Sequence, residues 1–285
     1  MKETLRLLRS MLRPIYGSGE SEAMIRLIFA QLKGWRPVDI VLHEDDELSP
    51  YIKRKVQEIA DRLMKHEPLQ YILGHARFYG LDIEVNPSVL IPRPETEELV
   101  DIVVRALGNR EDMHVLDACT GSGCIAVALA RNLRFPHITA FDISEPALDT
   151  ARSNAERLRT RISFLKADAL HLSDDSLPGA PWDAIVSNPP YIGGMEMAGM
   201  EPNVLEYEPH SALFVPDKEP LLFYEALGNY AVKTLKKGAG IYFEINPLHA
   251  SALQRLMLSL GFSSIELIRD MSGKQRFLTA RKPDV

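Results

Sequence analysis

The chain of 285 residues is 46% hydrophobic and 25% charged, which is ordinary for a globular protein and favours two domains or one domain with a cap. Its formal net charge of −6 argues against a protein that grips nucleic acid through a broad basic face. No apolar run reaches the ~18 residues of a transmembrane helix, and the amino terminus lacks the apolar core of a signal peptide. Two cysteines, Cys119 and Cys124, cannot build a disulfide framework, so we expect a cytoplasmic protein without a membrane span.

The first part of the chain is predicted to be helical. Residues 2–15 and 20–33 are rich in Leu, Ile and Met with charges between them. A further helix should begin at Ser49-Pro50, because serine is a favourable N-cap and proline suits the first helical turn. Apolar residues then recur at helical spacing up to Leu63, and the segment 66–68 should end this helix.

Two short strands are expected next, at residues 69–74 and 78–85, with a glycine-bounded turn between them. They would form a β-hairpin that joins the helical part to the rest of the chain. The pattern therefore divides the chain into a helical N-terminal domain at 1–68, a β-hairpin linker at 69–86 and a larger domain at 87–285.

The larger domain is predicted to be α/β. Expected strands at 113–119, 137–144, 162–168, 182–187, 240–246, 263–270 and 274–280 follow or alternate with helices at 94–107, 124–133, 145–158, 219–236 and 248–261. Such alternation is typical of a mostly parallel, doubly wound sheet, here with seven strands. Only a short turn at Ser272-Gly273 separates the last two strands, so these two must be antiparallel neighbours.

A glycine loop follows the first strand of this domain and leads into a helix. Its glycines, Gly121 and Gly123, let the backbone approach a ligand at a helix N-terminus. The pattern also fits a dinucleotide fingerprint, which is weak evidence alone. Asp117 lies four residues before the first glycine and favours S-adenosylmethionine instead, since a carboxylate there helps to place the cationic amino acid end of that cofactor.

Two more acids follow the next two strands. Asp142 lies about 20 residues beyond the glycine loop, where an acid accepts hydrogen bonds from ribose hydroxyls, although it could also cap the following helix. Asp168 could accept from an adenine amino group while the Ala169 N–H donates to a ring nitrogen, and a plain strand-end acid is an equal reading. The candidate cofactor-binding residues are Asp117, Cys119, Thr120, Gly121, Ser122, Gly123, Asp142, Ile143, Asp168, Ala169 and Asn188.

The tetrapeptide Asn188-Pro189-Pro190-Tyr191 comes directly after the apolar run at 182–187. Neither proline has an N–H, so the backbone here presents carbonyl acceptors, and the Asn188 side-chain oxygen adds another. Tyr191 offers an aromatic face to a planar group. Acceptors around an –NH₂ group can turn its nitrogen toward an electrophile. Alone, the motif could be a proline-rich turn, but it falls at the sheet edge that carries the cofactor residues, and we therefore predict these four as catalytic and substrate-binding residues.

With these residues in view, the chain resembles the HemK/PrmC family, the N5-glutamine methyltransferases of peptide chain release factors. The resemblance rests on P-L-Q-Y-I-L-G at 68–74, L-I-P-R-P-E-T-E at 90–97, N-P-P-Y at 188–191, E-Y-E-P at 206–209 and G-x-x-R at 273–276. It implies a Rossmann-like class I methyltransferase fold with an antiparallel C-terminal strand, and S-adenosyl-L-methionine as the cofactor. It also implies that the small helical N-terminal domain recognises the substrate, most specifically the Gly-Gly-Gln motif of release factors.

The chain departs from the family at a few positions. Cys119 stands where many relatives have the first glycine of the loop, so we expect position 119 to avoid a glycine-only backbone angle. Asn246 stands where glycine is common. Arg93 and Glu95 have a plain reading at a helix start, and a second reading as substrate-binding residues at the mouth of the site.

Three alternatives remain open. N-P-P-Y also serves methyltransferases that act on the N6 of adenine or the amino group of guanine, whose base is flipped onto the aromatic ring. A ribosomal-protein glutamine methyltransferase would share the whole motif set. A non-catalytic cofactor-binding module would not need an amide clamp. The eight histidines show no ligand spacing, so we expect no metal site. The net charge of −6 leads us to expect no direct nucleic acid binding, and a monomer is the default expectation.

Overall fold

The computed structural model describes residues 1–284, and its contacts divide the chain into two compact units. The first unit contains Met1–Gly74 and Glu201–Tyr207, and the second contains His75–Met200 and the residues from Glu208 onward. Val285, the last residue of the predicted larger domain, lies outside the described residues. No helix within residues 1–284 is long and apolar enough to cross a membrane.

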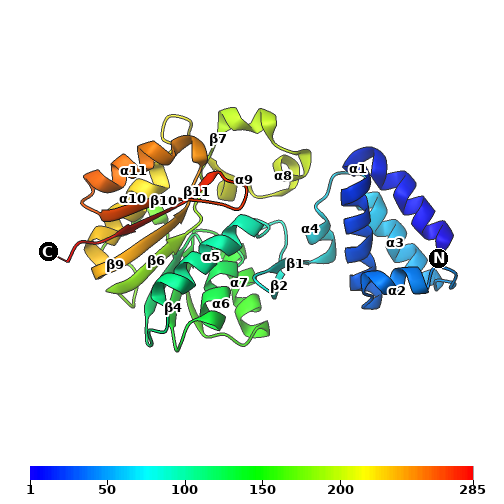
Figure 1. Cartoon of the computed structure of the whole chain (residues 1–285), viewed down its shortest axis with the longest axis horizontal. Coiled ribbons are helices and arrows are strands. Elements are labelled where there is room, and N and C mark those ends of the chain that lie inside the picture. The colour runs from blue at the N-terminus through cyan, green and yellow to red at the C-terminus, as the bar shows by residue number, and fades with distance from the viewer. Residues whose placement is uncertain (285) are drawn as a thin grey trace. The chain divides into compact units, whose positions relative to one another are not determined.

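The first unit is helical throughout. Its helices are α1 (Lys2–Lys33), α2 (Pro37–Leu42), α3 (Pro50–Leu63), α4 (Leu69–Leu73) and α8 (Pro202–Tyr207) (Figure 1). Gly17 interrupts α1 with a left-handed backbone (φ 71°, ψ 176°), so the two predicted helices meet there. The Ser49 hydroxyl accepts a hydrogen bond from the Ile52 N–H at 3.3 Å, which confirms the predicted cap of α3. The core of this unit contains the buried side chains of Leu8, Leu12, Ile28, Phe29 and Leu63.

The predicted strand at 69–74 is wrong, because residues Leu69–Leu73 form helix α4. Gly74 ends this helix in a left-handed conformation (φ 82°), and its N–H donates to the Gln70 carbonyl. A short apolar run has too few residues to distinguish a helical from an extended repeat. The hairpin lies further along the chain and consists of β1 (His75–Phe78) and β2 (Leu81–Glu84), which pair antiparallel.

The second unit contains a seven-stranded sheet with the order β10-β11-β9-β6-β3-β4-β5. The strands are β3 (His114–Ala118), β4 (His137–Asp142), β5 (Ile162–Lys166), β6 (Trp182–Ser187), β9 (Leu235–Glu244), β10 (Ser263–Arg269) and β11 (Gln275–Arg281). The ladders among β5, β4, β3, β6 and β9 are parallel, and β11 is antiparallel to both of its neighbours. The predicted Rossmann-like sheet with one antiparallel strand is confirmed.

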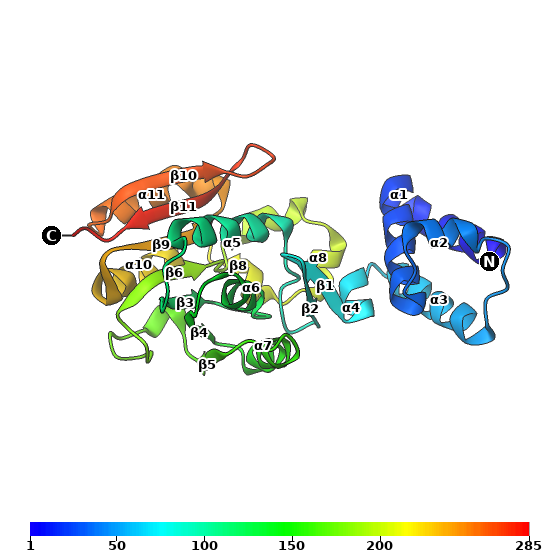
Figure 2. The same cartoon turned by 60° about the horizontal axis from the view of Figure 1, so that its bottom comes forward.

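Helices cover both faces of this sheet (Figures 1 and 2). One face carries α5 (Pro94–Leu107), α6 (Cys124–Asn132) and α7 (Glu145–Arg157), and the other carries α10 (Leu222–Thr234) and α11 (Ala250–Ser259). Shorter elements connect them: η1 (Ala169–His171), β7 (Ile192–Gly193), η2 (Gly194–Gly199), α9 (His210–Leu213), β8 (Phe214–Val215) and η3 (Pro247–His249).

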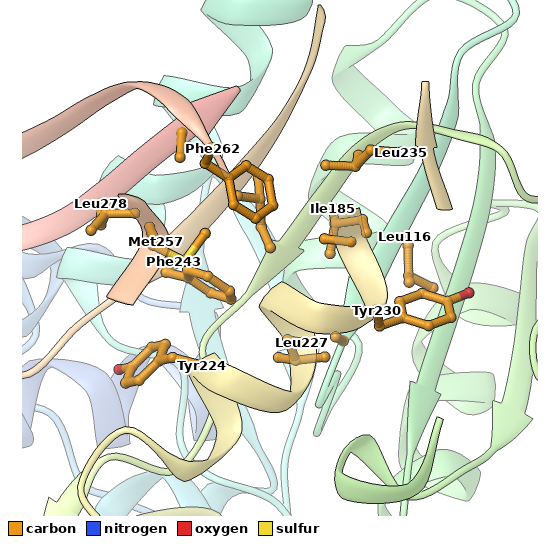
Figure 3. Packing of buried hydrophobic residues seen from close by; sticks show 14 of the residues in the cluster. Leu116, Ile185, Tyr224, Leu227, Tyr230, Leu235, Phe243, Met257, Phe262 and Leu278 are labelled. Atoms are coloured by element: carbon orange, nitrogen blue, oxygen red, sulfur yellow. The ribbon is translucent and has the colours of Figure 1, made fainter. Parts of the chain in front are cut away.

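The larger core lies between the sheet and helices α10 and α11 (Figure 3). Alternate strand residues point into it, among them Leu116, Ile185 and Phe243, which are all fully buried. Tyr224 and Leu227 meet them from α10. Each such side chain contributes roughly 1.5–3 kcal/mol by leaving water. Packing in this core holds the strands in place. The loops that follow β3, β4 and β6 therefore start from fixed positions at the carboxyl ends of these strands.

Candidate active site

A cavity in the second unit is walled by the loops that follow β3, β4 and β6. Nine of the predicted site residues line it: Arg93, Cys119, Thr120, Gly121, Ser122, Asp142, Ile143, Asn188 and Pro190. Seven others do not contribute to its wall: Glu95, Asp117, Gly123, Asp168, Ala169, Pro189 and Tyr191. The cavity therefore brings the glycine loop and the start of N-P-P-Y together.

Asp117 is fully buried at the end of β3, directly beneath the glycine loop. Its Oδ2 accepts hydrogen bonds from the Thr120 hydroxyl at 2.5 Å and from the Ala126 N–H at 3.1 Å. No group among residues 1–284 donates to its Oδ1. Burial raises the pKa of this carboxyl to about 7. An unpaired buried carboxylate oxygen at this place fits a cationic ligand group.

The glycine loop has the left-handed conformations that its residue types allow. Gly121 (φ 54°) and Gly123 (φ 76°) both lie in this region, and a Cβ on Gly123 would meet the Ala151 Cβ at 3.0 Å. Cys119 is also left-handed (φ 59°), in a region that favours glycine but that other residues also adopt. The chain turns at Cys119 as it leaves β3, and tertiary packing imposes this backbone conformation on any residue at that position. Burial raises the pKa of the Cys119 thiol, which stays protonated.

Asp142 holds the glycine loop from the end of β4. Its Oδ2 accepts from the Gly121 N–H at 2.9 Å, and its Oδ1 accepts from the Ser144 N–H at 3.0 Å. Burial raises the pKa of Asp142, and these hydrogen bonds oppose the rise. The Ser144 hydroxyl caps α7 by accepting from the Ala147 N–H, so Asp142 does not fill the N-cap position. Each carboxylate oxygen has a second lone pair available for a ligand hydroxyl.

Asp168 and Ala169 lie beyond β5, outside the cavity wall. Asp168 accepts from the Leu170 N–H at 2.9 Å and contacts the His171 ring at 2.7 Å. Partial burial acts to raise the pKa of Asp168, but these two hydrogen bonds lower it below its usual value. Asp168 therefore has the local hydrogen bonds of a structural acid at a strand end, and its contact with adenine stays a prediction.

Asn188 reaches the cavity from the end of β6, and a chain of hydrogen bonds connects it to a buried acid. Its Nδ2 donates to the Thr96 hydroxyl at 3.2 Å, and Thr96 donates to Glu244 at 2.7 Å. The Tyr191 hydroxyl donates to the other oxygen of Glu244 at 3.0 Å. Burial raises the pKa of Glu244, while the hydrogen bonds and the Arg276 guanidinium lower it.

The backbone of Tyr191 is tied down as well. Its carbonyl accepts from the Asn246 side chain at 3.3 Å, and Asn246 also donates to Glu196 at 2.9 Å. The departure from glycine at position 246 thus supplies a contact to N-P-P-Y. The Tyr191 ring packs partly buried against the core under α10, and burial raises the pKa of its hydroxyl.

Arg93 is paired on the cavity wall with Glu208, whose side chain is almost fully buried. Glu208 also accepts from the Ile91 N–H at 3.1 Å. Arg93 is the N-cap residue of α5 and also lies on the cavity wall, and its part in binding substrate stays a prediction. Glu95 lies in the first turn of α5 and does not line that wall.

Sequence reasoning gave no role to Thr96, Glu208, Glu244 and Asn246. Thr96 and Glu208 lie inside the L-I-P-R-P-E-T-E and E-Y-E-P segments, so the resemblance marked their neighbourhoods without assigning roles. Glu244 ends an apolar strand, where a buried acid is unusual, and that signal could have identified it.

Comparisons with known proteins cover both units. The family model of the PrmC N-terminal domain matches residues 3–74, and a methyltransferase domain model matches residues 115–196. The chain is 42% identical over 275 residues to a release factor glutamine methyltransferase of Bacteroides thetaiotaomicron, which covers 96% of this chain and 98% of that protein. It is 37% identical to the protein of the same name from Flavobacterium psychrophilum, over 94% of both chains.

Among solved structures, a methyltransferase from Pyrococcus furiosus matches 80% of this chain and 99% of its own, with a TM-score of 0.53 and 19% identity. This similarity supports the fold alone. The match to these two relatives covers 96% and 94% of this chain. The chain belongs to the family of release factor glutamine methyltransferases.

Proposed function

We propose that this chain transfers the methyl group of S-adenosylmethionine to the side-chain amide nitrogen of a glutamine in peptide chain release factors, most specifically in their Gly-Gly-Gln motif. The observation that carries this proposal is the Asn188 side chain, held by Thr96 and exposed to a cavity that the glycine loop also lines. The names of the curated relatives support the substrate. The protein would act in the cytoplasm, where release factors work.

The residues of the cavity wall, together with the buried Asp117 that precedes the glycine loop, fit S-adenosylmethionine. The unpaired Oδ1 of Asp117 suits the ammonium of its amino acid end, and Asp142 can accept from ribose hydroxyls beside Gly121. Gly121 has open space where a Cβ would stand, so the backbone can approach a ligand. The cofactor supplies an electrophilic methyl group on a sulfonium. We infer that Ser122, Thr120 and Ile143 shape the wall around it.

Asn188 and Pro189 are proposed to hold the substrate amide. A glutamine amide nitrogen is a poor nucleophile, because its lone pair is delocalised into the carbonyl. The Asn188 side-chain oxygen and the Pro189 carbonyl would each accept one amide hydrogen and aim the nitrogen at the methyl group. This orientation can supply roughly 7–11 kcal/mol of the barrier reduction. As the N–C bond forms, the bond between the methyl group and sulfur would break and its electron pair would stay on sulfur, leaving a neutral thioether. The nitrogen would lose one proton to water, so that the methylated amide is neutral.

The remaining motif residues are proposed to support that clamp. Pro190 keeps the turn rigid on the cavity wall. The Tyr191 ring packs against the core and does not line that wall, and we propose that its exposed part meets the amide plane of a bound substrate while its hydroxyl stays on Glu244. Arg93 is proposed to border the substrate entrance with its charge balanced by Glu208, and Glu95 would lie nearby on α5. We propose that the helical N-terminal domain recognises the release factor, and that the enzyme is a monomer that does not bind nucleic acid directly.

The experiment is methyl transfer from labelled S-adenosylmethionine to purified release factor, with total RNA and ribosomal protein as parallel acceptors. Mass spectrometry of release-factor peptides should find one added methyl group on glutamine. Asn188→Ala should lower kcat more than about tenfold and change the cofactor Kd little, because the lost acceptor acts mainly on the substrate amide. Labelling of RNA but not of release factor would overturn the proposal, and an Asn188→Ala enzyme above a tenth of wild-type turnover would overturn the role of Asn188.

A further inference from the structure

Two buried side chains outside N-P-P-Y continue the hydrogen-bond chain that starts at Asn188. Thr96, in the first turn of α5, and Glu244, at the end of β9, are each 2% exposed. Their hydrogen bond of 2.7 Å continues the 3.2 Å bond from Asn188 to the Thr96 hydroxyl. The cavity contains Asn188 and Thr96, whereas Glu244 lies behind them.

The direction of this chain of bonds is set by the chemistry of its members. An ionised carboxylate can only accept, so the single proton of the Thr96 hydroxyl points at Glu244. The Thr96 oxygen can then only accept from its other neighbour. Asn188 must therefore present its –NH₂ end to Thr96, and its oxygen is the end left over for another partner. Neither of these two hydrogen bonds uses that oxygen.

Several contacts of Glu244 favour the ionised form that this direction requires. Tyr191 donates to its second oxygen at 3.0 Å, and the Arg276 guanidinium attracts its charge. The amino-terminal end of α5, where Thr96 lies, adds a positive dipole. Burial is the strongest influence and, with the Glu95 carboxylate, keeps the pKa of Glu244 above its usual value, so the direction of the chain rests on the hydrogen bonds themselves.

We propose that Thr96 and Glu244 are positioning residues that keep the Asn188 amide in one orientation, with its oxygen toward the substrate amide. The two ends of a carboxamide have nearly the same shape, so without Thr96 the group can turn over. A reversed Asn188 would point N–H groups at the N–H groups of the glutamine substrate and repel them. The acceptor that the reaction needs is thus prepared before the substrate arrives. This inference rests on the proposed function.

The test compares Thr96→Val, Thr96→Ser and a matched control, Thr234→Val. Thr234 is also a buried threonine of the second unit, but its hydroxyl bonds to the Tyr230 carbonyl within α10. Thr96→Val should lower kcat/KM for the release factor by about tenfold or more, with the S-adenosylmethionine Kd within about twofold of wild type. Thr96→Ser restores the hydroxyl and should remain within about threefold, and the control should match wild type.

A second variant removes the charge that sets the direction. Glu244→Gln keeps the shape of the side chain but can donate to Thr96, so it should lower kcat/KM by a similar factor. The double variant Thr96→Val/Glu244→Gln should have a kcat/KM within about twofold of that of the slower single variant. The two losses should not add, because both substitutions act through Asn188. Cofactor titration of each variant gives the folded fraction, to which the rates are normalised.

Three results would overturn the inference while leaving the proposed function intact. These are a Thr96→Val enzyme with wild-type kcat/KM, a Thr96→Ser enzyme as slow as Thr96→Val, and a rate loss that is explained wholly by a weaker cofactor Kd. A wild-type enzyme that transfers no methyl group to release factor would instead overturn the proposed function.

Discussion

The buried carboxyl of Asp117 should make cofactor binding depend on pH. Burial raises its pKa to about 7, so in the free protein a large fraction is protonated near neutral pH. An ammonium group beside the unpaired Oδ1 would favour the charged form. Binding should therefore release a proton, and the affinity for S-adenosylmethionine should fall as the pH drops below about 7.

The size of this effect is set by the ionised fraction. With a pKa of about 7 in the free protein, the affinity should decrease about eightfold between pH 7.5 and pH 6. The stability of the free protein should depend on pH in the opposite direction to the cofactor affinity. Because the folded pKa lies above the unfolded value of 3.8, the stabilising contribution is complete below that value and is lost as the pH rises through about 7. The shift corresponds to an order of magnitude of about 4 kcal/mol.

Asp117→Asn should change both quantities. Its side-chain oxygen can keep the bonds from Thr120 and Ala126, which leaves the –NH₂ end facing the ligand ammonium. Losing a charge-assisted hydrogen bond of about 1.5–3 kcal/mol should weaken cofactor binding at pH 7.5 by about 10- to 150-fold. The free variant should be more stable than the wild type at about pH 8, because it buries no charge at this position.

Isothermal titration calorimetry at several pH values, in buffers with different ionisation enthalpies, gives both the Kd and the number of protons released. Asp142→Asn is the matched control, because its proposed partners are neutral hydroxyls, and it should keep the pH dependence that Asp117→Asn loses. A wild-type Kd that is the same at about pH 6 and pH 7.5, or an Asp117→Asn variant with the wild-type pH profile, would refute the reasoning.

Two predictions concern the stability of each unit. Cys119→Val should lower the free energy of unfolding by about 1 kcal/mol in urea denaturation, because a β-branched side chain is poorly tolerated at φ 59°; equal stability would contradict the left-handed assignment. Ser49→Ala should cost about 1 kcal/mol through the lost cap of α3, seen as an earlier loss of far-ultraviolet helix signal on heating, and an unchanged melting curve would show that the 3.3 Å bond contributes nothing.

The sheet could be predicted because its strands are short apolar runs bounded by turn residues. The strand at 182–187 matches β6 residue for residue, and every side chain in it is buried. The helix at 94–107 matches α5 for a similar reason, since proline marks its start and apolar residues recur through it. The hairpin was misplaced, because residues 69–74 contain no repeat long enough to separate helix from strand.

The buried residues that hold the site residues in place could not be predicted from the sequence. Thr96 and Glu244 are 148 residues apart in the chain, and Arg93 and Glu208 are 115 apart. Nothing local in either segment specifies these partners, because the fold alone brings them together. The left-handed angle at Cys119 was missed for a related reason: residue type indicates which angles are easy, whereas packing decides which angle is adopted.

The position of β11 has a consequence for the order in which the protein can form during synthesis. β11 is the last of the described strands to leave the ribosome, yet it lies between β9 and β10, and among those strands it is the only partner of β10. Until it arrives, β9 ends the sheet with an open edge and β10 has no strand to pair with. β11 also carries Arg276, whose charge acts on Tyr191 and Glu244. A nascent chain can thus assemble its cofactor loops early, but the clamp for the substrate amide is completed only with the final strand.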